Sequence, residues 1–120
     1  MSYQAYQTAS ARTEDPRNTE YRLLGQVTRA LMELETLDKR EIRKRAEVLD
    51  WNRRVWSAFA ADCASDHNGL PDQLRASIIS LSIFVSKETS DAMRGHVDLE
   101  ALISINRTVM QGLAPQPEAA

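Results

Sequence analysis

Apolar residues recur at helical spacing along most of this chain, and this periodicity limits the fold more than any other feature of the sequence. Between residues 49 and 63, one such face is formed by Leu49, Val55, Trp56, Phe59, Ala60 and Cys63. Residues three or four positions apart share a face of an α-helix, so the segment is predicted to be an amphipathic helix. A similar face follows residues 102–113. The chain is therefore expected to fold by packing helices against one another.

Start and stop signals place the first two expected helices. The first begins at Asp15 and Pro16, because aspartate can cap a helix and proline is tolerated at its first position. The second runs from Asp38 to about Ala64. Its start is predicted from Asp38 and Glu41, which have the spacing of a capping box.

Two further helices complete the prediction. The third has Pro71 in its first turn and ends at Gly95 as a left-handed cap residue, and the fourth runs from a capping Asp98 to Gly112. Residues 77–86 are rich in β-branched side chains and partly alternate with serine, as a strand does. No other segment has a strand pattern to pair with them, so we expect a helix there.

The predicted fold is all-α, a small bundle of about four helices in a single domain over residues 15–113. A flexible N-terminal arm over 1–14 and a disordered tail over 114–120 are expected to flank it. The hydrophobic share of 42% and the charged share of 27% are typical of a soluble globular protein. A net charge of −2 gives no overall field that would favour nucleic acid or an anionic membrane.

The sequence predicts a cytoplasmic protein without enzymatic chemistry. It has one cysteine, Cys63, and neither a secretory signal nor an apolar run that could span a bilayer. His67 and His96 fall in polar turns, the four glycines are scattered, and Cys63 ends an apolar face. These patterns lack the clustering that metal, phosphate or thiolate sites need. We therefore expect no enzyme activity, no cofactor and no metal site.

Two asparagine-arginine pairs interrupt the apolar faces. Asn52 lies near the middle of one face with Arg53 beside it, and Asn106 and Arg107 repeat the arrangement. An unpaired buried amide costs about 1–3 kcal/mol, so a wholly apolar environment is excluded. The amides can bond within the bundle and fix helix register, or bond a loop backbone at the edge of the core. Alternatively, both pairs line a groove that accepts a helix of a partner.

Additional apolar surface favours a binding role. Trp51 points away from the main apolar face and towards the side of Val55, which is typical of an interface anchor. Packing along another helix of the bundle is the alternative, and it is slightly favoured. Ile79 and Ile83 form a second apolar face on the third helix. Such surplus favours helix-in-groove binding, as in a helical adaptor or chaperone.

A basic segment over residues 39–54 suggests a second kind of partner. It holds seven basic and three acidic residues. Arg43 and Glu47, and likewise Asp50 and Arg54, are four positions apart, which is typical of a solvent-exposed face with weak ion pairs. A basic patch can also contact RNA, although stacking aromatic residues are missing from it.

The sequence resembles the FlaF family, the flagellar biosynthesis regulators of alphaproteobacteria. The matching segments are YQTAS at 6–10, EYRLLGQVTRAL at 20–31, WNRRVW at 51–56, NGLPDQLRASIISLSIFV at 68–85 and LISINRTVMQGL at 102–113. The resemblance implies a small cytoplasmic protein that is needed for flagellin production and export. It also implies that the protein binds flagellin as a secretion chaperone and acts with a counterpart, FlbT, that restrains flagellin synthesis.

Two functions of different kinds follow from these observations. The first is a flagellin chaperone, and the second is a regulator that contacts flagellin mRNA through residues 39–54. The residues that we expect to bind the partner protein are Trp51, Asn52, Arg53, Val55, Ile79, Ile83, Asn106 and Arg107.

Overall fold

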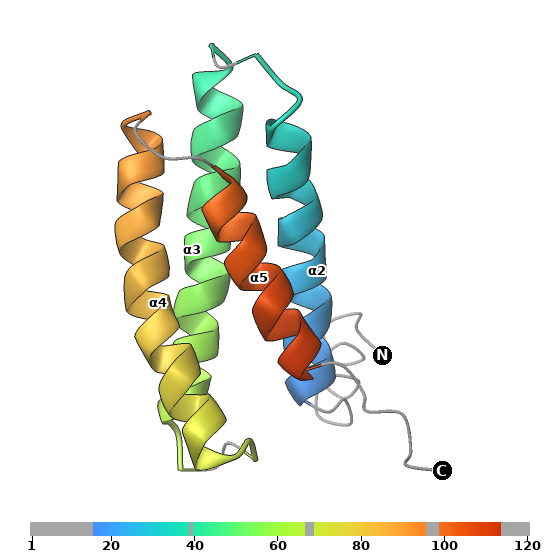
Figure 1. The fold of residues 1–120 in the computed structure, drawn as a ribbon, viewed down its shortest axis with the longest axis vertical. Coiled ribbons are helices and arrows are strands. Elements are labelled where there is room, and N and C mark those ends of the chain that lie inside the picture. Colours follow the sequence, from blue (N-terminus) through green and yellow to red (C-terminus); the bar gives the residue numbers. More distant parts are fainter. Residues whose placement is uncertain (1–15, 39, 67–68, 96–98, 114–120) are drawn as a thin grey trace, which may run out of the picture.

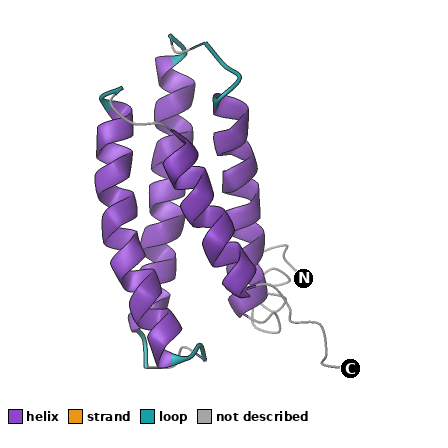
Figure 2. Ribbon diagram, viewed as in Figure 1, coloured by secondary structure: helices purple, strands orange, loops and turns teal. Residues whose placement is uncertain are grey.

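Four helices make up most of the described chain (Figures 1 and 2). The computed structural model describes residues 16–38, 40–66, 69–95 and 99–113. The helices are α2 (Pro16–Leu34), α3 (Ile42–Ala64), α4 (Asp72–Met93) and α5 (Leu99–Leu113). No strand occurs among these residues, so the prediction of an all-α bundle of about four helices is confirmed. The predicted arm at 1–14 and tail at 114–120, His67, His96 and the capping Asp98 all lie outside the described residues.

The helices surround the core in chain order, and successive helices run in opposite directions (Figure 1). The helix α3 contacts α2 and α4, and α5 contacts α4 and α2, which closes the ring. The pair α3–α4 has the most extensive contact and the pair α4–α5 the least. The backbones of α2 and α4 lie across the bundle from each other, as do those of α3 and α5. Side chains must therefore fill the space between these diagonal pairs.

The start of α3 differs from the sequence prediction. The helix begins at Ile42, and not at Asp38. The Asp38 carboxylate accepts a hydrogen bond of 2.9 Å from the backbone N–H of Arg40 and another of 2.9 Å from its guanidinium. These bonds lower the pKa of Asp38. Because the carboxylate stabilises the turn before the helix, the expected capping box with Glu41 does not form.

The other boundaries agree closely with the prediction. Residues 77–86 lie within α4, so their helical assignment is confirmed. Gly95 has a φ of 82°, the left-handed conformation expected for the residue that ends this helix. Pro71 takes the position just before α4 and not its first turn, and α5 extends one residue beyond Gly112.

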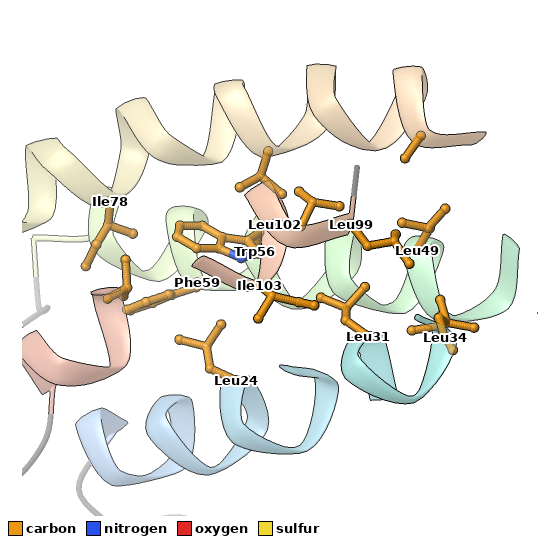
Figure 3. Packing of buried hydrophobic residues seen from close by; sticks show 14 of the residues in the cluster. Leu24, Leu31, Leu34, Leu49, Trp56, Phe59, Ile78, Leu99, Leu102 and Ile103 are labelled. Atoms are coloured by element: carbon orange, nitrogen blue, oxygen red, sulfur yellow. The ribbon is translucent and has the colours of Figure 1, made fainter. Parts of the chain in front are cut away.

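The core consists of aliphatic side chains from all four helices around two aromatic rings (Figure 3). Trp56 and Phe59 of α3 lie with their ring centroids 6.1 Å apart and their planes tilted by 46°. Cys63 is also fully buried there, as expected of a small apolar side chain. Burial, with smaller contributions from Glu20 and Asp62, raises the pKa of the Cys63 thiol to about 11. None of the described helices is both long and apolar enough to cross a bilayer.

Candidate functional site

Both asparagines belong to a hydrogen-bonded network inside the core. The side-chain oxygen of Asn106 accepts a bond of 2.8 Å from the indole N–H of Trp56. Its Nδ2 donates to Oδ1 of Asn52 at 2.8 Å and to Oγ1 of Thr28 at 3.1 Å. The Thr28 hydroxyl donates in turn to the carbonyl oxygen of Leu24. The network therefore joins α5 to α2, and it crosses the diagonal from α5 to α3.

The network matches the first interpretation of the asparagines, in which they bond within the bundle. Asn52 and Asn106 are both 0% exposed, so neither amide reaches the surface in this conformation. The Nδ2 group of Asn52 has no hydrogen-bond partner among the described residues. An unpaired buried donor is costly, and the network is therefore complete at Asn106 but incomplete at Asn52.

The arginines that follow the two asparagines reach different surroundings. Arg53 donates to the carboxylate of Asp50 at 2.8 Å, and Arg54 pairs with the same carboxylate at 3.1 Å. Arg107 lies over a methionine instead, with its Nη2 atom 3.3 Å from the sulfur of Met32. The two sequence repeats therefore differ at the surface, although their asparagines share one network.

An open groove runs between α2 and α5 beside Arg107. Its volume is about 510 Å³, and it is lined by Gly25, Thr28, Arg29, Met32, Glu33, Thr36, Arg107 and Met110. A Cβ atom on Gly25 would lie 3.4 Å from Cε of Met110, so this methionine packs against α2 beside the glycine. Thr28 lines the groove and also belongs to the core network. It therefore connects the groove to the buried amides.

Trp51 lies on a different side of the bundle. With residues of the α2 end and the following turn, it lines a pocket of about 360 Å³ between α2 and α3. Its side chain is half-buried there. The position agrees with packing along another helix, the alternative slightly favoured from the sequence.

The remaining predicted residues do not gather around Trp51. Val55 and Ile79 are half-buried and pack against the core, whereas Ile83 is 71% exposed on α4. Trp51 lies beside α2, and α2 makes no contact with α4. The structure therefore does not bring the eight predicted residues into one surface. It places Asn52 and Asn106 in the core and Arg107 in the α2–α5 groove.

Two features of the site were missed by the sequence analysis. The first is the groove itself, whose methionines Met32 and Met110 come from helices far apart in the chain. Gly25 inside an otherwise regular helical pattern is the signal that could have indicated it. The second is Arg75 of α4, which donates to the carbonyl oxygens of Cys63 at 2.7 Å and Ser65 at 2.8 Å. No periodicity marks that contact.

The basic segment carries more unpaired charge than its spacing predicted. The pair between Asp50 and Arg54 forms, but Arg43 and Glu47 do not pair with each other or with another described side chain. Arg45 likewise has no carboxylate partner among the described residues. No group of three or more His, Cys, Asp or Glu side chains in the described ranges is arranged to hold a metal ion.

The comparisons with known proteins confirm the resemblance found in the sequence. No curated protein and no solved structure matches this chain. The model of a protein family described as flagellar protein FlaF matches residues 2–113. This match covers nearly the whole sequence, including all four helices and both asparagine-arginine pairs. The chain therefore belongs to the FlaF family of flagellar proteins.

Proposed function

We propose that this flagellar protein is a non-enzymatic chaperone that binds flagellin in the cytoplasm and promotes its synthesis and export. Its binding site is the groove between α2 and α5, and the occupant is an amphipathic helix of flagellin. Such helices pack together in the filament and need a temporary apolar cover before assembly. The observation that carries the proposal is the open groove that combines Met32 and Met110 with the guanidinium of Arg107.

The dimensions of the groove suit a helix. Its α2 wall extends from Gly25 to Glu33, which corresponds to about 12 Å, or two helical turns, and Thr36 of the following turn extends it further. Methionine side chains adapt their shape to different apolar partners, which is useful for holding a segment only temporarily. Arg29 and Arg107 can pair with acidic residues at the margin of the bound helix, while Glu33 can pair with a basic one.

The test is a calorimetric titration of the full chain with its cognate flagellin. We expect Arg107→Ala to weaken binding about tenfold and leave the thermal midpoint nearly unchanged, because the side chain is exposed. Met32→Gln, at a residue that is 40% exposed, should have a similar effect. Arg54→Ala is the matched control on α3.

Arg53→Ala separates the groove from the wider set of residues predicted from the sequence. That set includes both Arg53 and Arg107, and of these two arginines only Arg107 lines the groove. If only Arg107→Ala weakens binding, the groove is the site. Absence of any complex at about tens of micromolar flagellin contradicts the proposal.

The second candidate is a regulator that contacts flagellin mRNA through residues 39–54. Arg43 and Arg45 favour it, because they have no carboxylate partner among the described residues, and such cationic side chains can neutralise phosphates. Binding to the leader RNA of the transcript, measured across a salt series, is the test. Affinity that is absent, or that does not decrease as salt increases, excludes this function.

A further inference from the structure

A second apolar pocket lies at the end of the bundle where α3 begins and α4 ends. Its volume is about 290 Å³, and it is lined by Ile42, Arg45, Ala46, Leu49, Ala92, Met93, Arg94 and Gly95. Leu49 and Ala92 are buried at its base, whereas Ile42 is 73% exposed and Met93 is 41% exposed at its margin. None of these residues belongs to the α2–α5 groove.

The two charged residues that the structure describes in the lining of this pocket are both basic. They are Arg45 and Arg94, and among the described residues no carboxylate lines the pocket. Arg45 has no ion pair with any other described side chain, and Arg94 has a single long one of 3.6 Å to Asp91. Guanidinium groups beside apolar surface bind carboxylates well, because a docked partner excludes water from the contact.

We propose that this pocket binds an acidic amphipathic segment of a second partner protein, other than the flagellin helix in the α2–α5 groove. A large apolar side chain of the segment enters between Ile42 and Met93. Carboxylates on either side of it pair with Arg45 and Arg94. The positive charge of the pocket requires an acidic segment, and its apolar base requires that the segment also carry an apolar side chain.

Two other occupants fit this chemistry less well. A second copy of the chain would meet the pocket through the same surface under two-fold symmetry, which would bring the arginines of one copy against those of the other. Single-stranded RNA gains affinity from bases that stack on aromatic side chains. The lining of this pocket contains no aromatic residue. An acidic protein segment is therefore the favoured occupant.

The test uses a fluorescent synthetic helical peptide with leucines on one face and glutamates on either side of them. A matched peptide carries lysines in place of the glutamates. We expect fluorescence anisotropy to show that the full chain binds the acidic peptide with a dissociation constant of about tens of micromolar, and the basic peptide far more weakly. Equal binding of the two peptides, or no binding of either, overturns the proposal.

Variants locate the site. The double change Arg45→Glu with Arg94→Glu should weaken binding of the acidic peptide at least about tenfold, and the single Arg54→Glu should not. Ile42→Gln, at an exposed position, tests the apolar contribution without disturbing the core and should also weaken binding. Unchanged binding in the double variant contradicts the proposal, provided that circular dichroism shows a folded protein.

Two further titrations separate this site from the functions proposed above. The double variant should bind flagellin as the unmodified chain does, and a loss of that binding would mean that the pocket belongs to the flagellin site. A uridine oligonucleotide should not compete with the acidic peptide. If the oligonucleotide binds and the peptide does not, the surface is a nucleic-acid site and the proposal is wrong.

Discussion

At the residue scale, Asn106 is the centre of the buried network and Asn52 lies at its edge. Asn106 uses its oxygen and its Nδ2 group to satisfy three other polar side chains from α2 and α3. Asn52 bonds only Asn106, through its side-chain oxygen, and its own Nδ2 has no partner among the described residues. The two asparagines, which have the same sequence context, should therefore contribute differently to stability.

Replacement of each asparagine by leucine tests this difference. Asn106→Leu should lower the free energy of unfolding by about 2–4 kcal/mol, because it leaves the indole N–H of Trp56 and the oxygen of Asn52 buried and unpaired. Asn52→Leu should change it by less than about 1 kcal/mol, since it also removes an unpaired donor. Urea unfolding measures both, and equal losses would contradict the assigned roles.

At the scale of the helices, Arg75 in the first turn of α4 binds the C-terminal end of α3. Its guanidinium donates to the carbonyl oxygens of Cys63 and Ser65, near the C-terminus of α3. The last carbonyl groups of a helix accept no bond from within it, and a positive charge there interacts favourably with the helix dipole. The contact therefore fixes the angle at which α4 leaves the turn after α3.

Arg75→Ala should lower the free energy of unfolding by about 1–3 kcal/mol, because it leaves two carbonyl groups without their charged donor. Arg75→Lys should recover only part of the loss, since an ammonium group cannot donate two bonds in the same planar geometry. Thermal unfolding measures the order of the three proteins. Arg54→Ala is the control, and as a change at an exposed ion pair it should cost less than about 1 kcal/mol.

The sequence predicted the helices well because each one depends mainly on local information. Apolar spacing located all four, and Gly95 marked the end of α4 through its own conformational preference. The predicted start of α3 was wrong, because the Asp38 carboxylate accepts from Arg40, while the backbone N–H of Glu41 donates to the Asp38 carbonyl oxygen at 2.9 Å. Spacing does not determine which of these nearby donors the carboxylate takes.

The site was less predictable because it depends on contacts between distant segments. Periodicity placed Asn52 and Asn106 within apolar faces, and this was correct. It could not show that the indole of Trp56 is the partner of Asn106, since that bond joins positions fifty residues apart. For the same reason, Met32 and Met110 were not recognised as the two sides of one groove.

At the scale of the whole molecule, Cys63 reports on global unfolding. Its thiol is fully buried, and its pKa is raised from 9.0 to about 11. Between these values the unfolded chain releases a proton that the folded chain retains, so stability decreases as pH increases. The contribution of the thiol is fully present below pH 9 and is lost as the pH passes 11.

The comparison of the unmodified protein with Cys63→Ala isolates this contribution. Between pH 8.5 and pH 11, the free energy of unfolding of the unmodified protein should decrease by about 2 kcal/mol more than that of Cys63→Ala. Urea unfolding at each pH is the measurement, and the alanine variant removes the effects of tyrosine and lysine titration. A difference that stays constant with pH would show that the folded thiol ionises normally.

The order of the helices around the core has a consequence for assembly. The α2–α5 groove and the pocket between α3 and α4 lie on opposite sides of the ring. A helix bound in the groove therefore does not cover the pocket. Under the two functions proposed above, a ternary complex can form, in which cargo is passed on without first being released.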